Sequence, residues 1–151
     1  MGTHYKGPQD IRKALDAYIK LVRASESVTS RVIKHLGDDG LTVSQFGVLE
    51  ALLHLGPLSQ RELAQKILKS GSNVTMVIDN LEKRSLVKRE RDEDDRRFYR
   101  VTLTPLGSKL IKSIFPRHAE RIASQMNILT KKELQELGRL CRKLGLQEAE
   151  G

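Results

Sequence analysis

The sequence is poor in aromatic residues and nearly devoid of cysteine. It has no tryptophan, and its aromatic residues make up only 4% of 151 residues. Proteins that hold single-stranded nucleic acid stack bases on aromatic side chains, so this scarcity favours a duplex if the partner is a nucleic acid. The one cysteine, Cys141, has no second cysteine with which to form an intrachain disulfide. We therefore expect a protein of a reducing, cytoplasmic compartment.

Long apolar runs and catalytic motifs are also missing. No stretch approaches the roughly 18 apolar residues of a membrane-spanning helix, and residues 1–8 lack the apolar segment of a secretory signal. The four histidines, His4, His35, His54 and His118, show no ligand spacing with cysteine or carboxylate, so we predict no metal site. No nucleophile–base set or phosphate loop is recognisable, so we predict neither an enzyme nor a bound cofactor.

Positive charge is abundant. The chain carries 27 lysines and arginines against 19 acidic residues, a net charge of +8. This excess is compatible with a polyanionic partner, nucleic acid before an acidic membrane, and equally with a solvated basic surface. The motifs must decide between these interpretations.

Both ends of the chain have the pattern of long amphipathic helices. Apolar residues recur at helical spacing from about Gln9 to Leu36, which is long for a globular helix and indicates association between chains. Thr104-Pro105 begins a second long helix, which Pro116 should kink. Thr130 and Glu133 then form a capping box before a last apolar helix. Cys141 lies on the apolar stripe of that helix, so we expect a buried structural thiol.

The middle of the chain predicts a helix-turn-helix. Capping boxes at Thr42–Gln45 and Ser59–Glu62 each begin a helix, and Ser70 is the expected N-cap of the next. Two short amphipathic helices thus meet at Lys69-Ser70-Gly71. The inward face of the second helix carries Val74, Val77, Ile78 and Leu81. Its outward face is polar and suits the major groove of DNA; the expected base contacts are Ser72, Asn73, Thr75 and Met76.

A charged β-hairpin follows this helix. Residues 86–91 and 99–103 have the pattern of strands, and residues 92–97 form a charged turn, as in the wing of a winged helix. We expect Asp95 to orient Arg97 toward the minor groove, although a solvated zwitterionic turn is the alternative. The other expected contacts, from the wing or to phosphates, are Arg96, Arg91, Arg89, Lys88, Lys69, Ser70, Lys83, Ser59 and Gln60.

The predicted fold is therefore mainly α, a winged helix of six helices and one hairpin in the order α-α-α-α-β-β-α-α. Residues 1–40 form an N-terminal dimerisation helix and residues 41–104 the DNA-binding winged helix-turn-helix. Residues 105–151 form C-terminal dimerisation helices, and all three segments belong to one compact chain. A winged helix can also serve as an adaptor that binds protein rather than specific DNA, which remains the second interpretation.

Several motifs resemble those of the MarR family of regulators. They are Asp95-Arg96-Arg97 followed by Val101-Thr102-Leu103-Thr104-Pro105 and Gly107, together with residues 41–46, 63–64 and 81–87. The resemblance implies a bacterial or archaeal homodimer that binds a pseudo-palindromic operator. It also implies repression that a small phenolic or aromatic ligand, or thiol oxidation, relieves. Because no cysteine lies near the first helix, we do not expect the oxidation mechanism. The family's pocket lies between the dimer region and the reading module, and the candidate ligand residues there are Tyr18, Ser25, Thr29, His35, Phe46 and His54; ordinary packing is the alternative for each.

Overall fold

The computed structural model describes residues 2–67 and 71–147, with side chains at all of these positions except 71 and 72. The helices are α1 (Gln9–Asp38), α2 (Val43–Leu55), α3 (Gln60–Ile67), α4 (Gly71–Lys83), α5 (Pro105–Met126) and α6 (Lys131–Leu146). The strands are β1 (Leu58–Ser59), β2 (Val87–Arg91) and β3 (Tyr99–Leu103). This order confirms the predicted winged helix and adds one short strand.

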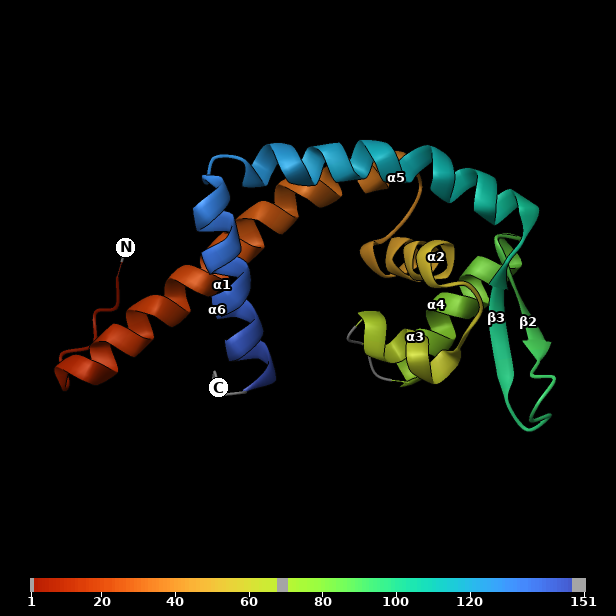
Figure 1. Cartoon of the computed structure of the whole chain (residues 1–151), viewed down its shortest axis with the longest axis horizontal. Coiled ribbons are helices and arrows are strands. Elements are labelled where there is room, and N and C mark those ends of the chain that lie inside the picture. The colour runs from red at the N-terminus through yellow and green to blue at the C-terminus, as the bar shows by residue number, and fades with distance from the viewer. Residues whose placement is uncertain (1, 68–70, 148–151) are drawn as a thin grey trace.

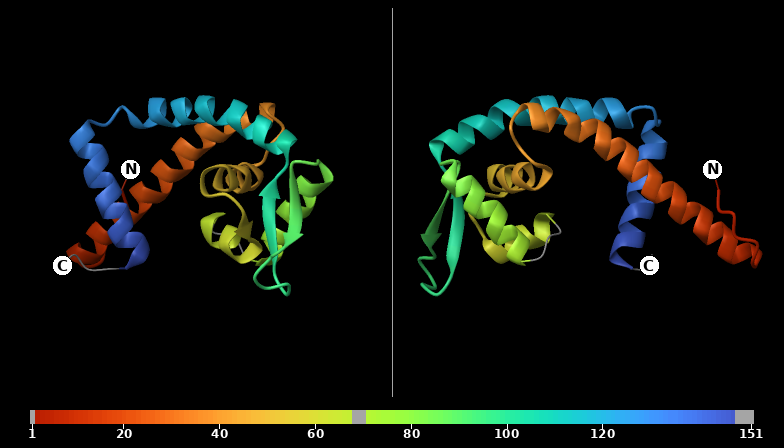
Figure 2. Two further views of the ribbon diagram at one scale, coloured as in Figure 1. Left: turned by 45° about the vertical axis from the view of Figure 1, so that its right-hand side comes forward. Right: turned by 180° about the vertical axis from the view of Figure 1, so that it is seen from behind.

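The elements form a compact module and a set of long helices that extend from it. Figure 1 shows α2, α3, α4 and the hairpin gathered beneath one end of α5, while α1 runs away from the module. The views in Figure 2 show the hairpin projecting from the module and α6 standing at the far end of the molecule. None of the described helices is long and apolar enough to cross a membrane.

Local side-chain chemistry explains where the helices begin. The hydroxyl of Thr42 accepts a hydrogen bond from the Gln45 amide at 3.1 Å, and the Gln45 side chain accepts one from the Thr42 amide at 3.0 Å. Thr130 and Glu133 repeat this arrangement before α6. Each pair satisfies backbone N–H groups that a helix start leaves unbonded. Two of the three predicted capping boxes are confirmed in full. At the third, the Ser59 hydroxyl accepts a hydrogen bond from the Glu62 amide at 3.1 Å. The predicted N-cap at Ser70 lies outside the described residues.

The core lies inside the module and under the first half of α5. Fully buried side chains come from α2, α3, α4, both hairpin strands and α5: Leu49, Leu63, Val74, Ile78, Leu81, Val87, Val101, Ile111 and Ile114. Three of the four predicted inward residues of α4 are completely buried, and Val77 packs against them partly exposed. Burial of this apolar surface is the main term that stabilises the module.

The sheet is antiparallel with the strand order β1-β3-β2. Val87 pairs with Leu103 and Arg89 with Val101, as expected of a hairpin whose turn spans residues 92–98. On the other edge of β3, Leu58 pairs with Val101. Sequence patterns missed β1 because two residues are too few for an alternating pattern to be recognised.

The start of α5 is bound tightly to the turn before β2. The Thr104 hydroxyl donates to the Ser85 carbonyl at 2.6 Å, and the Thr104 amide donates to the Leu86 carbonyl at 3.1 Å. Ser85 has a φ of 60°, in the left-handed region that usually favours glycine. A Cβ on Gly107 would lie 1.9 Å from the Leu86 carbonyl oxygen, so no larger residue fits. The helix then continues through Pro116 to Met126, arched in Figure 1.

Aromatic contacts join α5 to α2. The rings of Phe46 and His118 lie 4.2 Å apart, and those of His54 and Phe115 lie 4.6 Å apart. His118 is 7% exposed, and its Nδ1 atom has no hydrogen-bond partner among the described residues. Burial lowers the pKa of His118, the positive charge of Arg121 lowers it further, and Glu50 partly opposes them.

One sequence expectation is wrong for the single chain. Cys141 was expected to be a buried thiol, but it is exposed on α6. The reason is that α6 buries none of its residues within one chain, although its apolar stripe is present as predicted. An apolar stripe predicts a buried face but does not say which chain buries it.

The contact at Gly107 predicts a large effect of a small substitution. Gly107→Ala should destabilise the protein by roughly 1–3 kcal/mol, because the added methyl group must push the start of α5 away from Leu86. Denaturant unfolding measures this change. Gly37→Ala is the matched control, since a Cβ at Gly37 would meet no atom within 4 Å. Equal stability of the two variants would contradict the close packing at Gly107.

The burial of His118 predicts a loss of stability in acid. Its folded-state pKa is lowered, so the unfolded chain binds a proton first and stability falls as the pH drops below the ordinary value of about 6.5. His118→Phe should remove this part of the pH dependence, while His35→Gln, at an exposed position, should not. Urea unfolding at about pH 7.5 and about pH 5.5 measures both. An unchanged pH dependence in His118→Phe would show that His118 does not titrate in this way.

Candidate nucleic-acid interface

The outward face of α4 forms one wall of an open groove. The groove measures about 350 Å³ and runs between α4 and the start of α2; its lining residues are Thr42, Ser44, Gln45, Asn73, Met76, Val77 and Asn80. Asn73 and Asn80 are exposed, and Met76 is 66% exposed. Amides that both donate and accept, next to a flexible apolar side chain, match the groups on the edges of base pairs.

The remaining expected base contacts are placed differently. The Thr75 hydroxyl accepts a hydrogen bond from the Gln60 side-chain amide at 2.5 Å, so these two residues tie α3 to α4. Ser59 accepts from the Glu62 amide at 3.1 Å and lies at the start of α3. The side chain of Ser72 and the whole of Lys69 and Ser70 lie outside what the structure describes.

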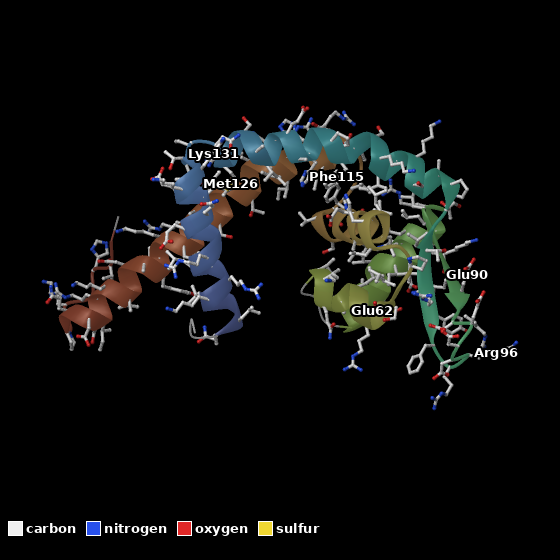
Figure 3. All side chains as sticks on the ribbon, viewed as in Figure 1. Glu62, Glu90, Arg96, Phe115, Met126 and Lys131 are labelled. Atoms are coloured by element: carbon white, nitrogen blue, oxygen red, sulfur yellow. The ribbon has the colours of Figure 1, made fainter. Side chains whose placement is uncertain are left out.

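Arg97 stands at the tip of the hairpin with a fixed guanidinium. Its Nε and Nη2 atoms donate to the two carboxylate oxygens of Asp95 at 3.0 and 2.8 Å. The side chain of Arg97 is 83% exposed, so its outer edge faces solvent. The side-chain hydrogen bonds between them lower the pKa of Asp95 and raise that of Arg97, so both groups stay ionised. The hairpin thus presents a cation in one orientation. Figure 3 shows where the tip of the hairpin lies, next to the labelled Arg96.

Other acidic groups of the turn also serve the hairpin. The Asp92 carboxylate accepts from the amides of Asp94 at 2.8 Å and Asp95 at 3.4 Å, and it lies 3.9 Å from Arg100. This bonding fixes the turn rather than repelling a polyanion, which explains why acidic residues occur beside so many arginines.

Arg89 faces the helix instead of solvent. Its guanidinium donates to Asp79 at 2.7 Å and to Glu82 at 3.0 Å, and its backbone amide donates to the Glu82 carboxylate at 3.2 Å. The Arg89 side chain is only 21% exposed. Two carboxylates of α4 are therefore held by one cation of β2, which fixes the angle between the helix and the hairpin.

The other expected cations remain at the surface. Lys88 pairs with Glu90 at 2.8 Å, and Arg91 donates to the Arg96 carbonyl at 2.7 Å while its guanidinium lies over the Tyr99 ring. Lys83 and Arg96 are exposed and form no ion pair within the described residues. Among the expected cationic contacts that the structure describes, these two have a charge that no ion pair engages.

Two exposed aromatic residues were missed by the sequence analysis. Phe98 is 58% exposed and Tyr99 46% exposed, and both lie on the hairpin. The Arg97 guanidinium lies 5.9 Å from the centre of the Phe98 ring. The sequence does contain a signal for them, because Phe98 and Tyr99 stand between Arg97 and Arg100 in a chain that has few other aromatic residues.

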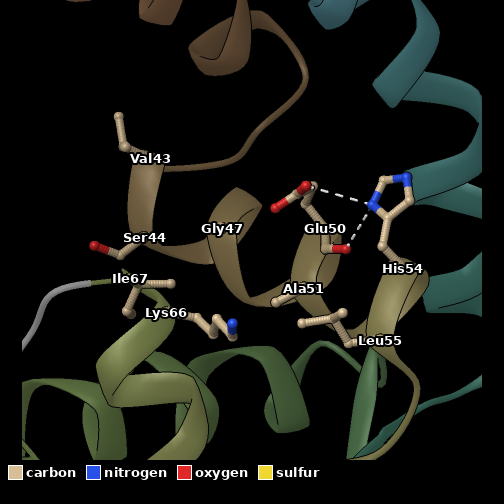
Figure 4. A pocket seen from close by; sticks show the side chains of 9 residues that line it. All are labelled: Val43, Ser44, Gly47, Glu50, Ala51, His54, Leu55, Lys66 and Ile67. Atoms are coloured by element: carbon tan, nitrogen blue, oxygen red, sulfur yellow. Dashed lines mark hydrogen bonds and ion pairs between the residues drawn. The ribbon is translucent and has the colours of Figure 1, made fainter. Parts of the chain in front are cut away.

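The candidate ligand residues do not gather in one place. Tyr18, Ser25, Thr29 and His35 are exposed along α1, and Phe46 is buried against His118. Only His54 among them lines the cavity of about 400 Å³ between α2 and α3 (Figure 4). No group of His, Cys, Asp or Glu side chains among the described residues could hold a metal ion.

Comparisons with known proteins agree with this geometry. The model of the MarR family matches residues 39–97. The HTH-type transcriptional regulator MhqR of Bacillus subtilis is 33% identical over 134 residues, which cover 89% of this chain and 92% of MhqR. AbsC, a MarR family transcriptional regulator from Streptomyces coelicolor, has the same fold, with a TM-score of 0.84, 23% identity and coverage of 95% and 97%.

A further solved structure is similar in sequence as well as in fold. It is BpsR of Bordetella bronchiseptica, whose DNA binding is regulated by 6-hydroxynicotinic acid. The TM-score is 0.75 and the identity 32%, over 86% of this chain and 91% of BpsR.

Proposed function

This chain belongs to the MarR family of transcriptional regulators, and we propose that it acts as a homodimer that binds a pseudo-palindromic site in double-stranded DNA. Its relatives are regulators, and the chain is accordingly not an enzyme. The supporting observation is the pairing of a polar helix face on α4 with an arginine fixed at the tip of the adjacent hairpin. This pairing suits a helix in the major groove and an arginine in the flanking minor groove.

Base contacts come from the first turns of α4 and backbone contacts from around it. Asn73 and Met76 reach base edges, with Ser72 and Thr75 beside them. Lys83, Arg96, Lys69, Ser70 and the start of α3 at Ser59 and Gln60 meet phosphates. Lys88 and Arg91 contact the DNA backbone from the hairpin.

Arg89 has a different role, because its guanidinium is paired with two carboxylates of α4. It positions the hairpin and makes no contact with DNA.

The dimer forms through residues 1–40 and 105–151, which leaves residues 41–104 as the DNA-binding segment. Apolar side chains on these end segments remain exposed in a single chain, at Ile11, Tyr18, Leu21, Ile33, Ile122, Leu137, Leu140 and Leu144. Their exposure favours burial against a second copy, because large apolar side chains that recur along α1, α5 and α6 suit a protein–protein interface. Cys141 lies among these leucines on α6, and we assign it a structural role rather than a redox one.

The dimer binds its operator in the cytoplasm and acts there as a repressor. A small aromatic or phenolic effector releases the dimer from the DNA. The similarity to BpsR supports a ligand of this class. A dimer places two recognition helices about one turn of B-form DNA apart, so any ligand that changes this separation lowers affinity. An adaptor that binds protein would instead show no dependence on the sequence of the duplex.

The fixed arginine predicts how affinity depends on salt. Arg97→Ala should weaken duplex binding by about 10- to 100-fold and reduce the slope of log affinity against log salt by about 1. Lys112→Ala removes the same unit charge from the exposed side of α5 and should change neither. Fluorescence anisotropy over a range of salt concentrations measures both quantities. An Arg97→Ala protein with unchanged affinity and slope would contradict the assignment of the hairpin to DNA.

Arg89 provides an internal comparison in the same titration. Arg89→Met should also lower affinity, because the angle between α4 and the hairpin is no longer fixed. Its salt slope should stay at the wild-type value, since the lost charge does not meet a phosphate. A slope reduced as in Arg97→Ala would make Arg89 a direct contact.

The dimer proposal predicts that one charge on α6 separates the subunits. Leu140→Glu would bury a carboxylate between two apolar helices, so the protein should sediment as a monomer of 17.1 kDa rather than as a dimer. Met76→Glu places the same charge on the exposed face of α4 and should leave the dimer intact. A Leu140→Glu protein that remains dimeric would exclude this face of α6 from the interface.

A further inference from the structure

Phe98 is an apolar side chain that the hairpin leaves in water. Among the described residues of segment 41–104, the exposed large apolar side chains are Val43, Leu55, Met76, Phe98 and Tyr99. The two most exposed are Met76, at 66%, and Phe98, at 58%. Met76 lines the groove on the outward face of α4, and Phe98 directly follows Arg97. A single exposed apolar residue is ordinary, but both of these lie on the surface proposed for DNA.

The turn holds the backbone of Phe98 at both of its polar groups. Its amide donates to the Asp95 carbonyl at 3.1 Å, and its carbonyl accepts from the Asp92 amide at 2.9 Å. The second of these bonds follows directly on the last strand pair, Arg91 with Tyr99. Phe98 therefore cannot retract toward the core without breaking the turn, and little backbone order has to be gained when its ring meets a partner.

The ring of Phe98 accompanies the cation of Arg97 without being covered by it. The guanidinium lies 5.9 Å from the ring centre, at the outer limit of a cation–π contact. The Tyr99 ring has a guanidinium closer to it, that of Arg91 at 5.1 Å, and is less exposed. The hairpin thus presents one bare apolar surface beside one oriented cation.

The proposed dimer gives this ring no cover. Figure 1 shows the hairpin and α6 at opposite ends of the molecule, so a second copy packed on the apolar stripe of α6 would not reach the hairpin turn. The nearest surface offered by the proposed function is the minor groove that receives Arg97.

The minor groove has two kinds of surface that match this pair. Narrow A·T tracts concentrate negative potential in the groove, which attracts the guanidinium of Arg97. The walls of the groove are deoxyribose rings, whose C–H groups are apolar. A groove that admits Arg97 brings such a wall next to Phe98, and burial of the ring against it removes apolar surface from water.

We propose that Phe98 is a specificity-determining residue whose ring packs on the deoxyribose wall of the minor groove that Arg97 enters. The proposal rests on the DNA binding proposed above, and it adds a contact that uses no charge. The ring meets the wall most closely where the groove is narrow. Through Phe98 the hairpin therefore reads groove width, and with it the base composition of the flanks, without touching a base edge.

The test uses duplexes that differ only where the hairpins lie. A duplex that the wild-type full chain recovers from a random pool is resynthesised with about six A·T pairs or about six G·C pairs outside each half-site. Fluorescence anisotropy at several salt concentrations gives the affinity for both duplexes and the slope of log affinity against log salt. We expect the wild type to prefer the A·T flanks.

Two variants of Phe98 separate the apolar contact from the aromatic face. Phe98→Ala should bind the A·T-flanked duplex about tenfold more weakly and reduce the preference for A·T flanks about threefold or more, with an unchanged salt slope because no charge is lost. Phe98→Leu keeps an apolar side chain and should stay within about threefold of the wild type. Since the ring is exposed, neither substitution removes a core contact.

Leu106→Ala is the matched control, because it removes a comparably exposed apolar side chain, 55% exposed, at the start of α5. It should behave as the wild type on both duplexes.

Three results would overturn the proposal while the wild type still binds duplexes, and they leave the proposed function intact. Phe98→Ala could keep both affinity and flank preference, which would show that the ring makes no contact. Phe98→Leu could be weakened as much as Phe98→Ala, or the salt slope could fall as in Arg97→Ala; either would show that the ring acts only by positioning Arg97. A wild-type chain that binds no duplex even in dilute buffer would instead contradict the proposed function itself.

Discussion

The position of the hairpin relative to α4 depends on Arg89. The guanidinium of Arg89, on β2, pairs with the carboxylates of Asp79 and Glu82 on α4. The pairing of β2 with β3 holds Arg89 in this position. The hairpin turn uses its acidic residues in the same way, so that Arg97 projects from a rigid frame with its guanidinium oriented by Asp95. A surface that reads DNA requires such preorganisation, because each side chain that must be ordered on binding reduces affinity.

The module contains most of the buried apolar residues, and the long helices contain few. Buried apolar residues hold α2, α3, α4, the sheet and the first half of α5 together, whereas α6 has no buried residue. The contact between the rings of Phe46 and His118 joins α2 to α5. Because burial lowers the pKa of His118, protonation of its imidazole would destabilise this contact. The buried core of the described residues therefore includes the first half of α5, while the proposed dimer would supply the burial that α6 lacks.

Local chemistry made much of the fold predictable. Capping residues such as Thr42 and Thr130 specify a helix start through bonds three residues away, and the hairpin follows from alternation on both sides of a polar turn. The pairing of Asp95 with Arg97 spans two residues and was equally accessible. The sequence shows the charge of Arg89 but not its pairing with Asp79 and Glu82, which the structure reveals. The exposure of Cys141 follows from an α6 that buries none of its residues within the chain, and the cavity between α2 and α3 follows from how two helices pack; neither can be seen in a sequence pattern.

The central claim is that two copies of one polar-faced helix, each beside an oriented arginine, are spaced to fit B-form DNA. Selection of bound duplexes from a random pool tests this claim most directly. We expect enrichment of an inverted repeat whose half-sites are centred about 10 bp apart, or a multiple of that distance, because the two-fold axis of the protein would coincide with that of the site. Recovery of unrelated sequences, or of a lone half-site without its inverted partner, would contradict it.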